Sequence, residues 1–281
     1  MDKRWISNVA TNFAAMFGIG SAIVSGFDIK QWSFMGESVL FALIGTAVQI
    51  LYLYLTKKRF QKFFGLLDNV PVNIAIASYW NVNVYDERLG EEKNYRYYKH
   101  DGDLNKKRYL VGAVEYPLTD VGVAAEAIQL AAYINRTGEH KVNLFGDENI
   151  HDAIEGTIIC LGSPTSNSAT KRLFARLPSE FNLSFTTKTL TSWLHEHEYR
   201  SNEKFDYGVL MRCTLNEKIY FVCAGIDEHG SIALSKLLMM NWKELPKVDF
   251  VQLYKVSKER SQVIDKLAGK TLFRPGEWVS D

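Results

Sequence analysis

Two long stretches near the start of the chain contain no charged residue. Residues 5–27 form an uncharged run of 23 residues, and residues 38–56 form a second run of 19. A helix rises about 1.5 Å per residue, so the runs span roughly 34 and 28 Å, close to the ~30 Å hydrocarbon core of a bilayer. The sequence therefore predicts an N-terminal two-helix transmembrane hairpin over residues 1–62, with spans at about 5–27 and 37–56. A cytosolic α/β domain is expected over residues 63–281.

Basic residues flank both runs and predict the orientation of the hairpin. Lys3 and Arg4 precede the first run, and the second is followed by Lys57, Lys58, Arg59 and Lys62. Positively charged flanks stay in the cytoplasm, which places both termini and the large domain there. A secretory signal peptide is a weaker interpretation, because the first run is too long and the second follows at once. Two buried core helices remain an open alternative.

The first run carries small residues at a regular interval. They recur every four residues, at Ala14, Gly18, Ala22 and Gly26. Small residues at this spacing let helices approach closely in lipid, and the polar side chain of Gln49 in the second run favours a partner helix or water. We therefore expect the lipid bilayer as one partner and assembly into a homo-oligomer. The alternative is that these residues only pack the two spans of one chain together.

The composition excludes several classes of site. The formal net charge is +1, so no overall basic field indicates a nucleic-acid partner. Cys160, Cys213 and Cys223 lie in apolar stretches without metal-type spacing and are typical of a reduced cytoplasmic domain. His195 and His197 would share one face of a strand, but no third ligand is near them in sequence. We expect neither a metal ion nor a cofactor.

Apolar runs alternate with helical patterns in the second part of the chain. Strands are predicted at residues 72–77, 109–116, 141–145, 156–161, 206–214, 218–224 and 250–256. Helices are predicted at residues 121–135, 169–176 and 232–242. This alternation predicts a mostly parallel sheet with helices on both faces, and the turn at Asn216 adds one antiparallel pair.

Ligands of such sheets bind outside the carboxyl ends of the strands. Segments at that position contain small and hydroxyl residues and lead into helices, whose N-termini favour anions such as phosphate. The candidate binding residues are Ser78, Thr119, Gly122, Gly162, Ser163, Asn167, Gly225, Gly230 and Ser231. They predict a nucleotide or another phosphorylated small molecule as ligand. The alternative is that they are ordinary connector residues, because neither a Walker-type sequence nor GxGxxG is present.

One carboxylate lies inside a predicted apolar helix. Glu126 follows the helix start by a turn and a half, and an unpaired buried acid is costly, so it is a candidate functional residue. The alternative is that Glu126 faces the rim of a cleft or pairs with an arginine such as Arg108.

The string from Asp120 to Glu126, DVGVAAE, resembles the D-x-G-x-A-x-E element of nucleoside deoxyribosyltransferase-like proteins. In that family the glutamate is the nucleophile that attacks the anomeric carbon of the sugar. The resemblance implies that Glu126 is the catalytic nucleophile and that Asp120 helps to hold the base. It implies a nucleoside- or nucleotide-processing enzyme, tethered to the membrane by the hairpin.

The whole layout resembles the two-transmembrane effectors of bacterial anti-phage defence. Some of these are retron effectors restrained by a reverse transcriptase–msDNA complex, and others answer cyclic nucleotides. The resemblance implies a toxin in the bacterial inner membrane that causes abortive infection. Its cytosolic domain would sense a nucleotide or a nucleoprotein, and its hairpin would oligomerise to disrupt the membrane. This is the leading hypothesis, and the tethered enzyme using Glu126 is the alternative.

Overall fold

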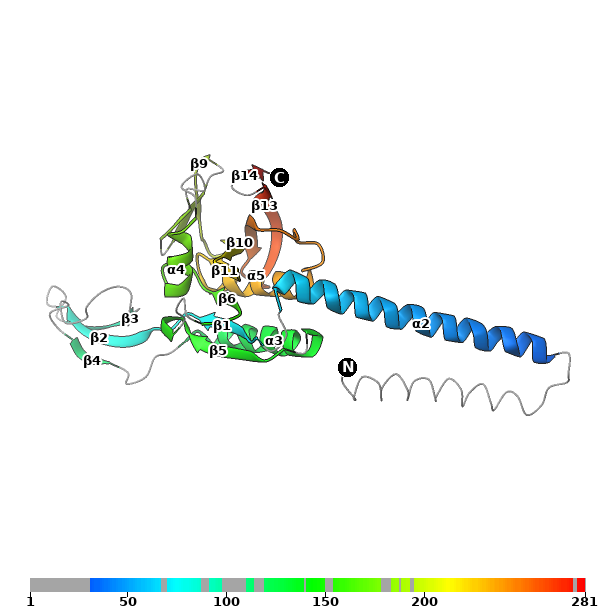
Figure 1. Ribbon diagram of the computed structural model, residues 1–281. Helices are drawn as coiled ribbons and strands as arrows, with labels where there is room; N and C mark the ends of the chain where they lie inside the picture. The colour runs from blue at the N-terminus through cyan, green and yellow to red at the C-terminus, as the bar shows by residue number, and fades with distance from the viewer. Residues whose placement is uncertain are drawn as a thin grey trace. The chain divides into compact units, whose positions relative to one another are not determined.

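A computed structural model describes most of the chain beyond residue 30. The described residues are 31–66, 70–86, 91–97, 110–113, 119–138, 140–149, 154–177, 183–186, 188–192, 195–274 and 277–280. The chain forms two compact units, residues 1–56 and 57–281. Figure 1 gives the order of the elements along the chain.

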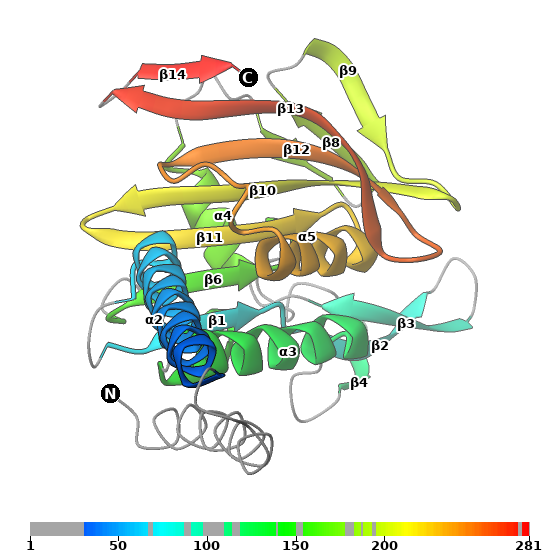
Figure 2. The same cartoon turned by 90° about the vertical axis from the view of Figure 1, so that its right-hand side faces the viewer.

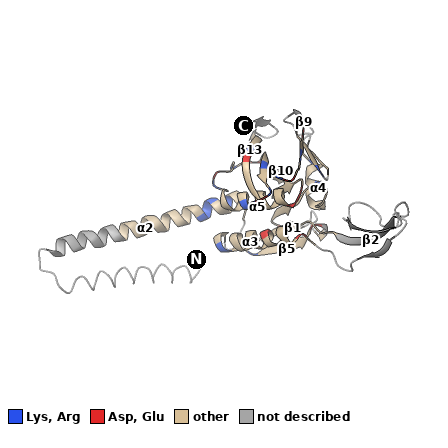
Figure 3. Cartoon of the chain, turned by 180° about the vertical axis from the view of Figure 1, so that it is seen from behind, with Lys and Arg blue, Asp and Glu red and all other residues tan. Residues whose placement is uncertain are grey.

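Helix α2 (Gln31–Phe64) covers the second uncharged run and continues through the basic segment after it. Its side chains are described from Leu43 onward. The basic residues form the blue segment of α2 in Figure 3.

The described helices do not form the expected transmembrane hairpin. None of the helices among the described residues is both long enough and apolar enough to cross a membrane. After Thr56, α2 carries Lys57, Lys58, Arg59 and Lys62, and its last turns bury Phe60, Phe63 and Phe64 in the core of the second unit. The first expected span, residues 5–27, lies outside the described residues, as do Ala14, Gly18, Ala22 and Gly26.

An eight-stranded sheet forms the centre of the second unit (Figure 2). In spatial order its strands are β14 (Glu277–Ser280), β13 (Gln262–Arg274), β12 (Phe250–Ser257), β10 (Phe205–Leu215), β11 (Lys218–Gly225), β6 (Thr157–Leu161), β1 (Val72–Ile76) and β5 (Val142–Gly146). The pairings of β5, β1, β6 and β11 are parallel, and all pairings from β11 through β10, β12 and β13 to β14 are antiparallel.

The sheet is therefore mixed, and the expected mostly parallel sheet is wrong. Only two residues, Asn216 and Glu217, separate β10 from β11, and both adopt positive φ angles, of 49° and 64°. Such a turn reverses the chain without a crossover helix. After β12 a short turn containing Ser261 (φ 44°) starts β13, a strand that sequence analysis did not predict. Asp265, Lys266 and Lys270 interrupt its apolar residues, so it has no long apolar run.

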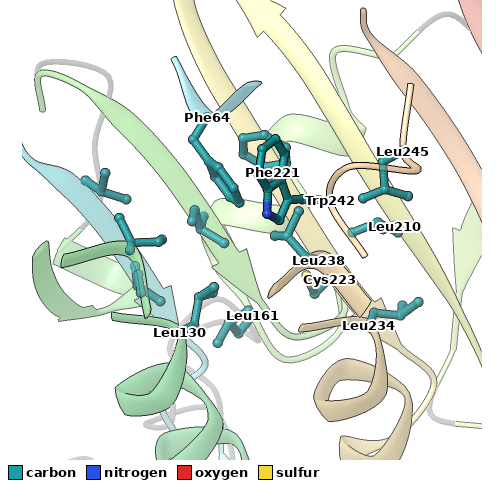
Figure 4. Close-up of a cluster of buried hydrophobic side chains, with 14 of the residues drawn as sticks. Phe64, Leu130, Leu161, Leu210, Phe221, Cys223, Leu234, Leu238, Trp242 and Leu245 are labelled. Carbon is teal, nitrogen blue, oxygen red and sulfur yellow. The ribbon is translucent and has the colours of Figure 1, made fainter. Parts of the chain in front are cut away.

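Helices α3 (Val121–Gly138) and α5 (Glu228–Met240) cover one face of the sheet, in front of it in Figure 2. Buried residues of α3 recur at helical spacing, and the last turns of α2 add three phenylalanines to the same core. The ring centroid of Phe64 lies 5.1 Å from that of Phe221 (Figure 4). The ring centroid of Phe60 lies 5.2 Å from that of Trp242. The segment from Lys57 to Phe64 thus belongs to the second unit.

The opposite face is covered by the short helix α4 (Ser168–Phe174) and a small three-stranded sheet. That sheet contains β7 (Ser184–Phe185), β8 (Thr189–Ser192) and β9 (His195–Arg200). Ala169, Leu173 and Leu190 belong to the same buried hydrophobic cluster as Ile158 and Cys160 of β6. Another small sheet contains β2 (Trp80–Asp86), β3 (Glu91–Tyr97) and β4 (Leu110–Ala113).

A buried ion pair crosses the antiparallel part of the main sheet. Arg212 Nη1 donates to Asp249 Oδ1 at 2.6 Å, and Arg212 Nε donates to the carbonyl oxygen of Phe63 at 3.3 Å. Asp249 also accepts hydrogen bonds from the backbone N–H and the hydroxyl of Thr214, at 2.7 and 3.0 Å. These contacts attach β10 to the loop before β12 and to the end of α2.

Candidate ligand-binding pocket

A pocket of about 910 Å³ opens where β1, β6 and β11 end. Its lining comes from the residue after β1, the loop after β6, the starts of α3 and α5, one face of α4, and β7 with its flanks. These residues are Ala77, Leu161 to Ser166, Thr119, Asp120, Val123, Ile226 to Glu228, Ser231, Lys171, Phe174, Ala175 and Leu183 to Thr186. Parallel strands bring their carboxyl ends to one edge, so the following loops meet there.

The loop after β6 presents hydroxyl groups to this pocket. Ser163 Oγ lies 2.6 Å from Thr165 Oγ1 and 3.3 Å from Ser166 Oγ. Gly162 has a φ angle of 125°, and a Cβ there would come within 3.1 Å of the Ala77 side chain. Glycine is therefore needed at this position, because the loop begins with a conformation and a close approach that other residues resist.

Asn167 holds the same loop in place from beneath. Its side-chain amide donates to the carbonyl oxygens of Leu161 and Ala75, at 3.0 and 3.2 Å, and its Oδ1 accepts from Thr170 N at 3.0 Å. The side chain is fully buried and does not line the pocket. Asn167 thus caps α4 and links the ends of β1 and β6.

Ser78 and Thr119 were both predicted as ligand residues, and the structure uses their hydrogen bonds within the fold. The backbone N–H and the hydroxyl of Ser78 donate to Asp147 Oδ1, at 2.9 and 2.8 Å, while Asp147 Oδ2 accepts from Ser168 N at 2.6 Å. Thr119 Oγ1 donates to the carbonyl oxygen of Ala77 at 2.8 Å. Thr119 lines the pocket, whereas Ser78 supports its edge.

Helix α4 contributes a cation and an aromatic ring that sequence analysis did not single out. Lys171 and Phe174 both line the pocket and are three residues apart, so they share one face of the helix. The ring of Phe174 lies 5.7 Å from that of Phe185 in β7, centroid to centroid, with 53° between the planes. A basic helix was predicted here, but nothing in the sequence pairs Phe185 with it.

The start of α5 forms the opposite wall of the pocket. Asp227 caps the helix by accepting from His229 N at 3.1 Å, and its other oxygen accepts from Ser201 Oγ at 2.9 Å and pairs with Lys258. Ser231 lines the pocket, and its Oγ accepts from Gly225 N at 3.0 Å.

Gly225 and Gly230 lie behind this wall and allow close packing. A Cβ on Gly225 would lie 2.5 Å from Ser231 N, and a Cβ on Gly230 would lie 2.5 Å from Asp206 Oδ2. Both glycines are buried, and neither lines the pocket. Their role in the described structure is to let β11 and α5 approach each other and Asp206.

Two neighbouring carboxyl groups stabilise this helix start. Asp206 is fully buried, and its Oδ2 accepts from Asp227 N at 3.2 Å and from Gly230 N at 2.7 Å. Burial, together with the nearby Asp227 carboxyl group, raises the pKa of Asp206 to about 8. Burial opposes ionisation of Asp227 as well, but its interactions with Asp206, Lys258 and Ser201 outweigh burial and lower its pKa. Near neutral pH the pair therefore holds one proton and one negative charge.

Glu126 lies where α3 packs against α5, and it does not line the pocket. A Cβ on Gly122 would lie 2.8 Å from Ile232 Cδ1 of α5, and one turn further along both helices Glu126 interacts with Lys236. Burial raises the pKa of Glu126, and Lys236 partly opposes this shift. Glu126 Oε1 has no hydrogen-bond partner among the described residues. Arg108, its suggested partner, lies outside them.

The other predicted candidates lie away from the pocket. Gln49 is exposed on α2. Cys160, Cys213 and Cys223 are buried, and burial raises the pKa of the Cys160 thiol to about 12. Over the described part of the chain, no three His, Cys, Asp or Glu residues are grouped so that they could hold a metal ion.

Comparison with protein-family models finds no match to this chain, and no curated protein sequence matches it.

Proposed function

We propose that residues 57–281 form a sensor domain that binds a nucleotide in the pocket beside β1, β6 and β11. The observation that carries the proposal is the placement of the hydroxyl-rich loop, Gly162 to Ser166, and Lys171 in one pocket. Hydroxyl donors and an ammonium group are suited to a phosphate. The volume of about 910 Å³ falls within the range of small-molecule sites, near its upper end.

The charge distribution favours a nucleotide over a simple anion. Asp120, Asp227 and Glu228 also line the pocket, at the starts of α3 and α5. Carboxylates repel a bare phosphate but accept hydrogen bonds from ribose hydroxyls and from the amino groups of bases. A ligand with a phosphate at one end and hydrogen-bond donors at the other can bind Lys171 with its phosphate and the carboxylates with its donors.

The chemistry of the lining supports binding more than catalysis. Among the described residues that line the pocket there is no histidine or cysteine, and Glu126 is not one of them. The deoxyribosyltransferase-like alternative required Glu126 to reach the anomeric carbon of a bound sugar. No observation favours it as a second candidate.

The test is ligand-dependent stabilisation of the full chain. Thermal unfolding is measured with inorganic phosphate and with each common ribonucleoside mono- and triphosphate. A ligand present at 100 times its Kd adds about 2.7 kcal/mol to the free energy of unfolding. For a unit of this size that raises Tm by roughly 5–10 °C. Failure of every nucleotide to bind with a Kd below about 1 mM, a free energy of about −4 kcal/mol, would contradict the proposal.

Two neighbouring residues of α4 provide a matched pair of variants. Lys171→Met removes the cation that lines the pocket, and Arg172→Met removes one that does not. Loss of a hydrogen bond to a charged group predicts roughly ten-fold or greater weakening of nucleotide binding for Lys171→Met alone. Equal affinity of the two variants, measured by titration calorimetry, would remove Lys171 from the site.

The broader expectation of an anti-phage effector stays a prediction. It included restraint by a reverse transcriptase–msDNA complex, homo-oligomers and an inner-membrane location with cytoplasmic termini. The proposal keeps from it only the sensing of a nucleotide, because its membrane-disrupting step depended on the hairpin.

A further inference from the structure

We propose, resting on the nucleotide-sensing function, that Phe174 and Phe185 form the platform on which the base of the ligand stacks. The site is then selective for nucleoside phosphates over phosphorylated sugars. Phe174 and Phe185 are the specificity-determining residues, and Lys171 binds the phosphate.

The two rings come from different elements and meet at the pocket. Phe174 ends α4, Phe185 ends β7, and both line the pocket while remaining half-buried. Their centroid separation of 5.7 Å and tilt of 53° are those of a packed aromatic pair. A pair held in this way offers a fixed apolar surface. A planar base can stack on it without a loss of side-chain entropy, because the rings are already ordered.

The position of Lys171 determines the orientation of the bound nucleotide. Residues three apart on a helix have their Cβ atoms about 5–6 Å from each other, so the ammonium group of Lys171 and the ring of Phe174 lie within the reach of one nucleotide. The hydroxyls of the loop after β6 line the same pocket. A phosphate at Lys171 leaves the base over the rings and the sugar facing the remaining polar lining.

A purely structural role for the pair makes a different prediction. The rings also join β7 to α4, and if that were their whole role, their removal would weaken every ligand to the same extent. Base stacking instead predicts a loss confined to ligands that carry a base. Aromatic–base stacking contributes enough free energy to change affinity by about five- to a hundred-fold.

The experiment compares adenosine 5′-monophosphate with ribose 5-phosphate on the full chain, together with the other nucleoside 5′-monophosphates. Titration calorimetry is performed on the parent chain and on Phe185→Leu. The matched control is Tyr199→Leu, which removes a ring of the Tyr199–Tyr207 pair outside the pocket (centroids 5.3 Å apart). We expect the tightest nucleotide to bind at least five-fold more tightly than ribose 5-phosphate, and only Phe185→Leu to abolish that difference.

The parent chain gives a second readout that does not depend on a variant folding. Saturation-transfer NMR should transfer more signal to the base protons than to the ribose protons of the bound nucleotide. Equal affinity for ribose 5-phosphate and every nucleotide, or a Phe185→Leu chain that keeps the full preference, would overturn the base platform alone. No binding of any of these ligands would overturn the nucleotide sensor and the platform together.

Discussion

The two halves of the main sheet use the same kind of strand for different purposes. In the parallel half, β5, β1, β6 and β11 send their carboxyl ends to one edge, where the segments that follow β1, β6 and β11 line a pocket. In the antiparallel half, tight turns such as Asn216–Glu217 return the chain at once, and buried polar contacts tie strands to neighbouring segments. Connection type, more than strand composition, decides which half can hold a ligand.

The largest expected effect tests the antiparallel half as a scaffold. Asp249→Ala leaves Arg212 buried without its ion-pair partner, and we expect the free energy of unfolding to fall by about 3–5 kcal/mol. Nucleotide affinity of the folded fraction should not change. Urea unfolding and calorimetry measure the two quantities. The double variant Arg212→Met, Asp249→Leu should regain much of the lost stability. A fall of less than about 1 kcal/mol in the free energy of unfolding of Asp249→Ala would show that the ion pair does not stabilise the fold.

The next effect tests the parallel half, where stability and binding should change together. Asn167→Ala leaves the carbonyl oxygens of Leu161 and Ala75 without their side-chain donor, at a cost of about 1–3 kcal/mol. Because the loop after β6 loses its anchor, nucleotide affinity should fall as well. Asn202→Ala is the control, since Asn202 Oδ1 caps a turn before β10 by accepting from Lys204 N and Phe205 N, both at 2.9 Å. Unchanged affinity in Asn167→Ala would separate the loop from the site.

A third prediction concerns Asp206 and Asp227, where the two halves meet. Because the folded state raises the pKa of Asp206 from 3.8 to about 8, its contribution to stability is complete below about pH 4 and is lost as pH rises toward 8. Asp227 has a lowered pKa, so its contribution is lost only at more acidic pH. The free energy of unfolding should therefore fall by at most about 1.4 kcal/mol per pH unit in this window from Asp206.

Asp206→Asn should flatten that dependence, because the amide oxygen can still accept from Asp227 N and Gly230 N but does not titrate. Urea unfolding at several pH values between about 5 and 8 measures the slope. The exposed Asp265→Asn is the control. A slope that persists in Asp206→Asn would assign the pH dependence to another group.

The smallest expected effect concerns the packing of α3 against α5. A Cβ on Gly122 would lie 2.8 Å from Ile232 Cδ1, the atom that Ile232→Val removes. Gly122→Ala should therefore be more favourable in the Ile232→Val background, with a coupling energy of about 0.5–1 kcal/mol. A double-mutant cycle in urea measures it. Additive changes would show that the helices already adjust to a Cβ at this position.

The sequence predicted the parts of the sheet that carry continuous apolar runs. VNIAI of β1 and TIICL of β6 are almost entirely buried, and the positive φ of Asn216 fits the predicted hairpin. β13 was missed because Asp265, Lys266 and Lys270 interrupt its apolar residues. The mostly parallel sheet was wrong because tight turns, rather than crossover helices, connect the later strands. Local pattern does not report which strand pairs with which.

The residues of the pocket were also predicted only in part from the sequence. Glycine and hydroxyl residues after β6 were recognisable from sequence, and Gly162, Ser163, Thr119 and Ser231 line the pocket. Asn167 belongs to the same string but directs its hydrogen bonds into the fold. Whether a polar side chain faces a ligand or a backbone carbonyl depends on the surrounding tertiary packing. Phe185 could not be found for that reason, since its ring meets Phe174 only in the folded chain.

The burial of Phe60, Phe63 and Phe64 has a consequence for the newly made chain. Arg212, which bonds the carbonyl oxygen of Phe63, follows it by 149 residues, and the covering residue Trp242 comes later still. At a synthesis rate of about 5–20 residues per second, Phe221 and Trp242 follow their ring partners Phe64 and Phe60 by roughly 8–36 s. During that interval the growing chain carries an incompletely covered aromatic segment beside Lys57, Lys58, Arg59 and Lys62, whose charges keep it hydrated until β10, β11 and α5 emerge.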